Sequence, residues 1–423
     1  MNQKYYISQK VLTSIFKNAF FMIAGNLLYK ILRALYIIVI AIYLEPDLFG
    51  MFSYAMSYYI PFFVLTNLGV DKIISNSIAC DKSAEPKIVG HTFSLKLIIS
   101  LITALIFGMI GIITEDILKV KILFVIISIA LVGRSMAIWA QQVFTAYEIS
   151  IQSFRQQIIF RPLEIICAMI AVASGFSILV LAAIHALSWC LQAFSGLQLV
   201  RHHFKTVSFK NNWKQINYLL KQCFLIGITG MMISFLCHAP IIITRYTEGI
   251  GNNLGQLALA MQAFLLLSIM FRTFNDAAFP VISRSTLYGD GKDFLYVKNC
   301  IRIGTLLSVI GALTAIETGP FFVNLLFGAK YSKTGQLLGQ VLLLIIPLIW
   351  GSTINSLYFA KCHYLKALLC AFLGGASFLF SLFFFISPIE ITDVILCTAS
   401  GMIVWSVALV VMMDRHERKL ILL

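Results

Sequence analysis

The chain has 423 residues, of which 60% are hydrophobic and only 12% are charged, and its mean hydropathy is +0.90. This composition exceeds what the core of a soluble protein can bury, so it excludes a large water-soluble domain and indicates many membrane-spanning helices. The nine cysteines are scattered without a CxxC pair or a cluster with histidine, so they indicate neither disulfides nor a metal site. We expect no cofactor.

Apolar runs of about twenty residues, separated by polar breaks, predict an all-α membrane protein with twelve transmembrane helices. The first six spans cover residues 17–44, 49–70, 92–114, 119–144, 157–174 and 177–200. The second six cover residues 222–244, 254–279, 301–327, 337–360, 365–386 and 391–413.

The longest basic break divides the chain nearly in half. We therefore predict an N-terminal six-helix lobe over residues 1–205, a basic cytoplasmic linker over 206–221 and a C-terminal six-helix lobe over 222–423. The two lobes are expected to enclose a central cavity, as in transporters built from duplicated halves.

Lysines and arginines predict the orientation, because cytoplasmic loops carry an excess of them. With the N-terminus inside, the cations in outer loops are only Lys119, Lys121, Arg245, Lys330 and Lys333. Arg155 and Arg161 fall in an inner segment, and both termini are predicted to be cytoplasmic. Topology thus explains most of the net charge of +14, and no nucleic-acid partner is expected.

An internal repeat is indicated by an offset of 205 residues, which aligns residues 49–56 with 254–261. The offset pairs Gly50 with Gly255, each opening the second span of its half, and it pairs Asp71 with Asp276. Repeats of this kind are common in transporters. We predict two bundles with the same membrane orientation, related by an axis along the membrane normal.

Four cations fall inside predicted spans, where each costs about 2.5 to 3.5 kcal/mol at the centre of a helix. In the first span, Asn26, Lys30 and Arg33 share one helical face because they are spaced four and three apart. In the eighth span, Ser268, Arg272 and Asp276 form a similar row.

Cations outnumber carboxylates at mid-depth, which predicts a cavity for an anion such as a diphosphate, since arginine can bind phosphate oxygens through two nitrogens. The candidate substrate-binding residues are Lys30, Arg33, Arg272, Arg134, Asp276 and Asn26.

Purely structural alternatives stay open for these cations. Arg272 could pair with Asp276, and Lys30 or Arg33 could pair with Asp71, as neutralised pairs that fix helix packing. Arg134 could equally well line a cavity or pair with a side chain that only fixes the packing.

Other polar residues and motifs indicate no chemistry. His185 in the sixth span is expected to be a helix–helix hydrogen-bond partner. The sequence contains no P-loop, HExxH, GxSxG or paired catalytic carboxylates, so we assign no catalytic residue and expect a transporter and not an enzyme.

Three motifs carry a family resemblance: LxxxxFGxFSYAxS at Leu44–Ser57, LGxDKxxxxxIA at Leu68–Ala79 and FPVISR at Phe279–Arg284. With them the chain resembles the polysaccharide flippases of the Wzx type. These belong to the same superfamily as the multidrug-and-toxin exporters and the lipid II flippase. Length, twelve spans, inside termini and the basic central loop fit this family over the whole chain.

The resemblance implies a carrier that moves an undecaprenyl-diphosphate-linked oligosaccharide repeat unit from the cytoplasmic to the periplasmic leaflet of the inner membrane. The product would be O-antigen of lipopolysaccharide or a related surface polysaccharide. The resemblance also implies diphosphate contacts for Lys30 or Arg33 and for Arg272, and we favour Arg33 for its planar fork. The implied partners are the lipid-linked oligosaccharide, membrane lipid and, as an option, other polysaccharide assembly proteins.

Two other functions compete with a flippase. A cation-coupled multidrug exporter of the same fold would need membrane-embedded carboxylates, whereas the charges at mid-depth here are positive. A polysaccharide polymerase or ligase typically carries a large periplasmic loop, but no predicted outer loop exceeds about a dozen residues.

Overall fold

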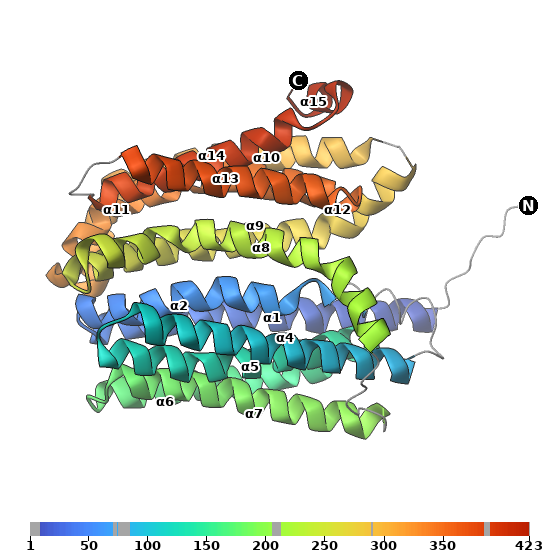
Figure 1. Cartoon of the computed structure of the whole chain (residues 1–423), viewed down its shortest axis with the longest axis horizontal. Coiled ribbons are helices and arrows are strands. Elements are labelled where there is room, and N and C mark those ends of the chain that lie inside the picture. The colour runs from blue at the N-terminus through green and yellow to red at the C-terminus, as the bar shows by residue number, and fades with distance from the viewer. Residues whose placement is uncertain are drawn as a thin grey trace, which may run out of the picture. The chain divides into compact units, whose positions relative to one another are not determined.

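The computed structural model describes residues 9–70, 74, 85–204, 213–288, 291–384 and 390–422. In these ranges the regular secondary structure is helical throughout (Figure 1), which confirms the predicted all-α class. The chain divides into two compact units.

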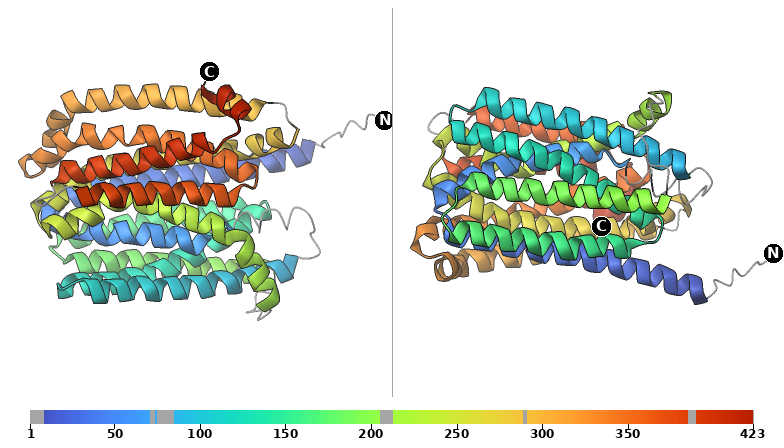
Figure 2. Two further views of the ribbon diagram at one scale, coloured as in Figure 1. Left: turned by 45° about the horizontal axis from the view of Figure 1, so that its top comes forward. Right: turned by 90° about the horizontal axis from the view of Figure 1, so that it is seen from below.

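The first unit, hereafter the N-unit, comprises Met1–Val39 and Phe62–Phe224. It contains most of α1 and the end of α2, followed by four helices that Figures 1 and 2 show running side by side. The bounds are α1 (Gln9–Tyr43), α2 (Pro46–Asn67), α4 (Glu85–Thr114), α5 (Leu118–Ala146), α6 (Ser150–Ala173) and α7 (Ile178–Phe204). Helix α5 is central, because it packs against α4, α6 and α7.

Aromatic residues on α4 and α5 form the core of the N-unit. Trp139 packs edge-on against Phe93, with 5.2 Å between the ring centroids, and its indole nitrogen donates to Thr92 at 3.3 Å. Val143 and Phe144 continue this buried cluster along α5. The α4–α5 contact is therefore largely apolar at this level, with the indole N–H of Trp139 satisfied by Thr92.

The second unit, hereafter the C-unit, comprises Ile40–Pro61 and Leu225–Leu423. Helix α14 packs on α12 and α13, and α11 packs on α9 and α10. The bounds are α8 (Trp213–Glu248), α9 (Asn252–Tyr288), α10 (Lys292–Phe327), η2 (Ala329–Tyr331), α11 (Ser332–Leu343), α12 (Ile345–Ala360), α13 (Tyr364–Phe384), α14 (Ile391–Val411) and α15 (Arg415–Leu422).

Eleven helices in the described part of the chain are long and apolar enough to cross a membrane, judged by length and composition. One of these spans, Ala329–Ala360, holds α11 and α12 in succession. Helix α1 is not among the eleven, although its 35 residues exceed the roughly 20 that the hydrocarbon core needs. Each of the twelve predicted spans overlaps one of these helices or α1.

The predicted lobe boundaries stay a prediction. Of the predicted linker over 206–221, residues 206–212 lie outside the described part of the chain, and residues 213–221 form the start of α8. The end of α1 from Ile40 and most of α2, up to Pro61, belong to the C-unit, a grouping that sequence order does not predict.

Arg155 and Arg161 lie in α6, which begins at Ser150, before the start of the predicted fifth span at residue 157. The polar first turns of α6 lack the apolar run that marks a span, yet they are helical and bury Ser153, Gln156 and Gln157 against neighbouring helices. Arg161 is only 4% exposed. Hydropathy alone therefore placed the start of this helix too late.

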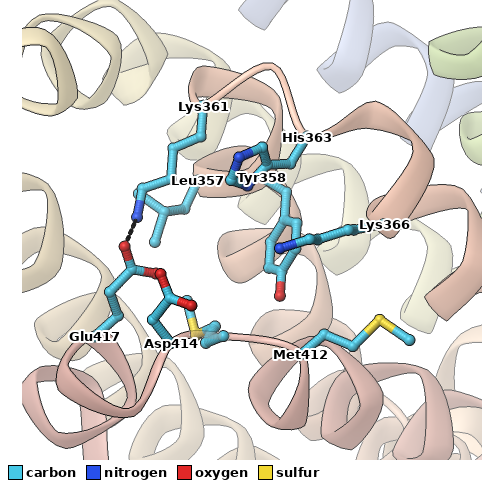
Figure 3. Close-up of a pocket in the computed structure, with 9 residues that line it drawn as sticks. Leu357, Tyr358, Lys361, His363, Lys366, Met412, Asp414 and Glu417 are labelled. Carbon is cyan, nitrogen blue, oxygen red and sulfur yellow. Dashed lines mark hydrogen bonds and ion pairs between the residues drawn. The ribbon is translucent and has the colours of Figure 1, made fainter.

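Helix α15 follows the last predicted span and was not predicted, because its sequence RHERKLIL lacks a long apolar run. Figure 3 shows Lys361, which follows α12, paired with Glu417 of α15. Arg418 donates to the backbone carbonyl of Met413 at 3.1 Å. These contacts attach α15 to the C-unit.

Helices α2 and α9 approach at two glycines. A Cβ atom on Gly255 would lie 1.8 Å from the carbonyl oxygen of Pro46, and one on Gly50 would lie 2.8 Å from the backbone nitrogen of Gly255. The two glycines that the predicted repeat pairs therefore contact each other. Equivalent positions of a two-fold repeat meet only near its axis, so this contact supports the offset of 205 residues.

We expect Gly255→Ala to lower the thermal unfolding midpoint of the purified protein, because the added methyl group would overlap backbone atoms. Overpacking of this kind typically costs about 1–3 kcal/mol. Gly251→Ala is the control, since nothing lies within 4 Å of its added Cβ. Equal midpoints for the two variants in the same detergent would contradict the close approach.

Candidate functional site

Helix α1 presents a polar row to the N-unit and an apolar row to its surroundings. Tyr29, Arg33 and Tyr36 follow one another at spacings of four and three, so they share a face. The exposed large side chains of this stretch, Leu27, Ile31 and Leu35, lie on the opposite face. Arg33 therefore points away from the face suited to lipid, and Lys30 is half-buried between the two rows.

Arg134 of α5 lies beside the row on α1. It is 8% exposed, and its guanidinium group donates to the hydroxyl of Tyr29 at 3.4 Å. The charge of Arg33 also acts on this hydroxyl. The guanidinium carbon of Arg134 lies 3.9 Å from the ring centroid of Phe63, a cation–π contact worth about 2 kcal/mol when desolvated. Two arginines thus converge on one phenol.

A buried ion pair on α6 makes further hydrogen bonds to α7. Arg161 contacts the carboxylate of Glu164 at 2.5 Å, and the other carboxylate oxygen lies 2.6 Å from Nδ1 of His185. Arg161 also donates to Ser188 at 2.9 Å and to the side-chain oxygen of Gln192 at 2.8 Å. Partners on α6 and α7 therefore satisfy most of the hydrogen-bonding groups of this arginine.

Trp189 of α7 connects these two groups. Its ring lies 3.8 Å from the guanidinium carbon of Arg161 and 5.2 Å from that of Arg134. The result is one continuous set of polar side chains from four helices, which we call the N-unit polar cluster. Its members are Tyr29, Arg33, Arg134, Arg161, Glu164, His185, Ser188, Trp189 and Gln192.

Positive charge exceeds negative charge in the N-unit polar cluster, which has three arginines and one carboxylate. Glu164 contacts Arg161 and His185, so its charge is already compensated. Arg33 lies at the edge of the cluster and is half-buried, whereas Arg161 is enclosed. An anion that reached the cluster would therefore meet Arg33 before Arg161.

The predicted cations of the two halves have different surroundings. Arg272 of α9 is half-buried and donates to the sulfur of Cys237 on α8 at 3.7 Å. Asn26 lies in α1 and Asp276 in α9, but their side chains are outside what the structure describes, as is Asp71. The alternative pairings of Arg272 with Asp276 and of Lys30 or Arg33 with Asp71 stay predictions.

Sequence reasoning missed Arg161 and Glu164 as a buried pair. Their spacing of three within one apolar helix is the signal that could have revealed it. The expected role of His185 as a helix–helix hydrogen-bond partner is confirmed by its contact with Glu164. In the described part of the chain, no group of three or more histidine, cysteine, aspartate or glutamate side chains could hold a metal ion.

Solved structures with the same fold include transporters of the MOP superfamily. The lipid II flippase MurJ, in an inward closed conformation, matches with a TM-score of 0.69 and 15% identity over 93% of this chain and 87% of MurJ. A multidrug resistance MATE family transporter in an inward-facing conformation matches with a TM-score of 0.66 and 12% identity over 89% of this chain and 92% of its own.

A third neighbour is a MOP superfamily transporter from Pyrococcus furiosus, with a TM-score of 0.66 and 13% identity over 93% of both chains. Its binding pocket is described as having reverse polarity, which suggests a different function. At such identities the likeness establishes the fold, which this chain shares with these transporters.

The family follows from the sequence match. A model of the family described as polysaccharide biosynthesis protein matches residues 15–286, which is more than half of the chain. The chain belongs to this family, which confirms the resemblance stated from its motifs. A search of curated proteins found no match.

We expect Glu164→Gln to lower the unfolding midpoint strongly, because it leaves the buried guanidinium of Arg161 without its carboxylate. Breaking one side of a buried pair typically costs about 3–5 kcal/mol. Glu317→Gln, at an exposed position of α10, is the matched control.

The double variant Arg161→Gln/Glu164→Gln removes both charges and should recover much of the lost stability. A Glu164→Gln protein that unfolds at the wild-type temperature would show that the pair does not stabilise the N-unit.

Proposed function

We propose that the protein is a flippase that moves an undecaprenyl-diphosphate-linked oligosaccharide repeat unit from the cytoplasmic to the periplasmic leaflet of the inner membrane. The repeat unit would serve O-antigen or a related surface polysaccharide. The observation that carries this proposal is the excess of arginine over carboxylate in the N-unit polar cluster, of whose four helices α5, α6 and α7 are suited to span a membrane. Membership of the polysaccharide biosynthesis family agrees with it.

Arginine suits a diphosphate because its planar group binds two oxygens at once and stays charged at any relevant pH. Arg33 is the best placed contact in the N-unit, since it is half-buried and adjoins Arg134 through Tyr29. Arg272 is the corresponding proposed contact in the C-unit, and Lys30, Arg134, Asn26 and Asp276 complete the proposed substrate-binding residues. Arg161 is engaged by Glu164 and serves packing in this proposal.

Transport would follow alternating access, in which the substrate site opens first to one side of the membrane and then to the other. A membrane potential negative inside favours outward movement of an anionic head by about 2.3 kcal/mol per charge per 100 mV. The proposal therefore needs no coupling ion to drive the charged head outward.

A cation-coupled multidrug exporter is the main alternative function. It would require an available membrane carboxylate, but in the N-unit polar cluster the carboxylate of Glu164 is held by Arg161 and His185. The fold does not decide between the two functions, because MurJ and a MATE family transporter share it. The sign of the charge in the N-unit polar cluster favours an anion.

The short connections between helices on the predicted outer side argue against a polysaccharide polymerase or ligase. On the predicted orientation the outer loops include residues 115–117, 174–177 and 249–251, which leave no room for a soluble catalytic segment. We therefore propose transport without a catalytic step.

We expect Arg33→Ala and Arg272→Ala to stop surface polysaccharide display in a strain that lacks its own copy of the protein, at normal protein level. Lysine at either position keeps the positive charge but loses the planar guanidinium group that binds two oxygens, so its effect should be milder than that of alanine. Arg155→Ala is the matched control, because Arg155 is an exposed cation on α6. Display is measured by gel analysis of extracted polysaccharide.

Full display in both alanine variants would reject the anion site. Export of cationic dyes by the wild type, with loss on Asp276→Asn, would favour the multidrug exporter.

The proposed topology is tested by reporter fusions after Asn211 and after Asn252. The first site should report a cytoplasmic location and the second a periplasmic one, because α8 would cross the membrane between them. Reporters on the same side would contradict both the orientation and the assignment of α8 as a span.

A further inference from the structure

The C-unit contains an apolar groove that the proposed substrate contacts do not use. It has a volume of about 420 Å³ and lies between α8 and α13, with one residue contributed by α2. Its lining is uncharged throughout and includes Tyr58, Phe235, Ile242, Phe372, Gly375 and Leu379.

The groove is open along helices that can span a membrane. Both α8 and α13 belong to the candidate spans, and Phe372 and Leu379 on its rim are 60% and 64% exposed. From Met232 to Ile243 the lining follows α8 for roughly 16 Å at 1.5 Å per residue. A groove of this shape suits one extended hydrocarbon chain.

Polar groups gather at one end of the groove. The hydroxyl of Tyr58 lies 3.3 Å from that of Tyr246, which is one turn beyond Ile242 on α8. Tyr54 also donates to Tyr246, at 3.2 Å, and the guanidinium carbon of Arg245 lies 5.9 Å from the ring of Tyr54. The apolar lining therefore leads to three phenols and an arginine.

We propose that this groove binds the polyprenyl chain of the lipid-linked substrate, with the phosphate next to the chain facing Arg245 and the tyrosine hydroxyls. This inference rests on the proposed function. A polyprenyl diphosphate has a single chain with its negative charge at one end, which matches one groove with cationic and hydroxyl groups at one end. A phospholipid brings two acyl chains, of which the groove holds one.

The groove also has a place in the transport cycle. On the predicted orientation, α2 begins and α8 ends at the outer side of the membrane, so Arg245 lies level with the outer leaflet. The groove therefore receives the chain of the lipid after its head has crossed. It is a product-side site, distinct from the arginines of the N-unit polar cluster.

The test fills the groove and measures binding of undecaprenyl phosphate to the purified full chain in detergent. Gly375→Phe places a ring in the groove and should weaken binding about tenfold or more. Gly375→Ala is the first control, because its added Cβ would lie 3.8 Å from the nearest atom of Met232, an ordinary contact. Leu373→Phe is the second, since Leu373 is exposed on the same helix outside the groove.

Both controls should bind like the wild type. Ala239→Leu narrows the groove from α8 and should weaken binding in the same direction, which keeps the test valid if Gly375→Phe does not fold. Arg245→Gln should weaken binding of undecaprenyl phosphate but not of undecaprenol, which lacks the phosphate.

Unchanged binding in the folded groove-filling variants would overturn the proposal. Equal competition by dioleoyl phosphatidic acid would overturn the assignment to a polyprenyl chain and indicate an ordinary acyl chain.

Translocation of a labelled lipid-linked repeat unit in vesicles separates this inference from the proposed function. Normal translocation and normal undecaprenyl phosphate binding by Gly375→Phe, with loss of translocation in Arg33→Ala, would reject the groove and keep the flippase. A wild type that binds undecaprenyl phosphate in the groove but moves no repeat unit would reject the flippase.

Discussion

The N-unit depends on how it keeps guanidinium groups inside helices suited to span a membrane. Arg161 is neutralised by Glu164, held by Ser188 and Gln192 and stacked on Trp189. These contacts link α6 to α7, which in turn packs along α5. Because a buried charge is tolerated only with such partners, the positions of these helices and of Arg161 determine each other.

In the same packing, Arg33 and Arg134 have different partners from those of Arg161. Arg134 donates to Tyr29 and is covered by the aromatic faces of Phe63 and Trp189, and the charge of Arg33 acts on the same phenol. These contacts orient the guanidinium groups through a phenol and two aromatic rings. We propose that the diphosphate binds beside Arg33, and that the apolar groove of the C-unit, with Arg245 at one end, binds the lipid chain after the head has crossed. The two proposed sites together match a lipid with an anionic head and one long chain.

Sequence could predict the helices, the family resemblance and the cations inside spans, because hydropathy, motifs and residue type are local properties. It could not predict that Arg161 is buried, since the first turns of α6 are polar and become buried only against neighbouring helices. The position of Arg134 beside Tyr29 could not be predicted either, because it depends on the packing of α5 against α1. Helix α15 was missed because its charged sequence has no span-like run, and Lys361 and Glu417 attach it through a tertiary contact.

The central claim is that the protein carries an anionic lipid head across the membrane. It is tested most directly by vesicles that contain the purified protein and either a diphosphate-linked repeat unit or the same oligosaccharide on a neutral polyprenyl ether. Exposure of the sugar to a membrane-impermeant reagent measures translocation. The account predicts protein-dependent translocation of the diphosphate lipid and none of the neutral one. Equal rates for the two lipids would contradict it.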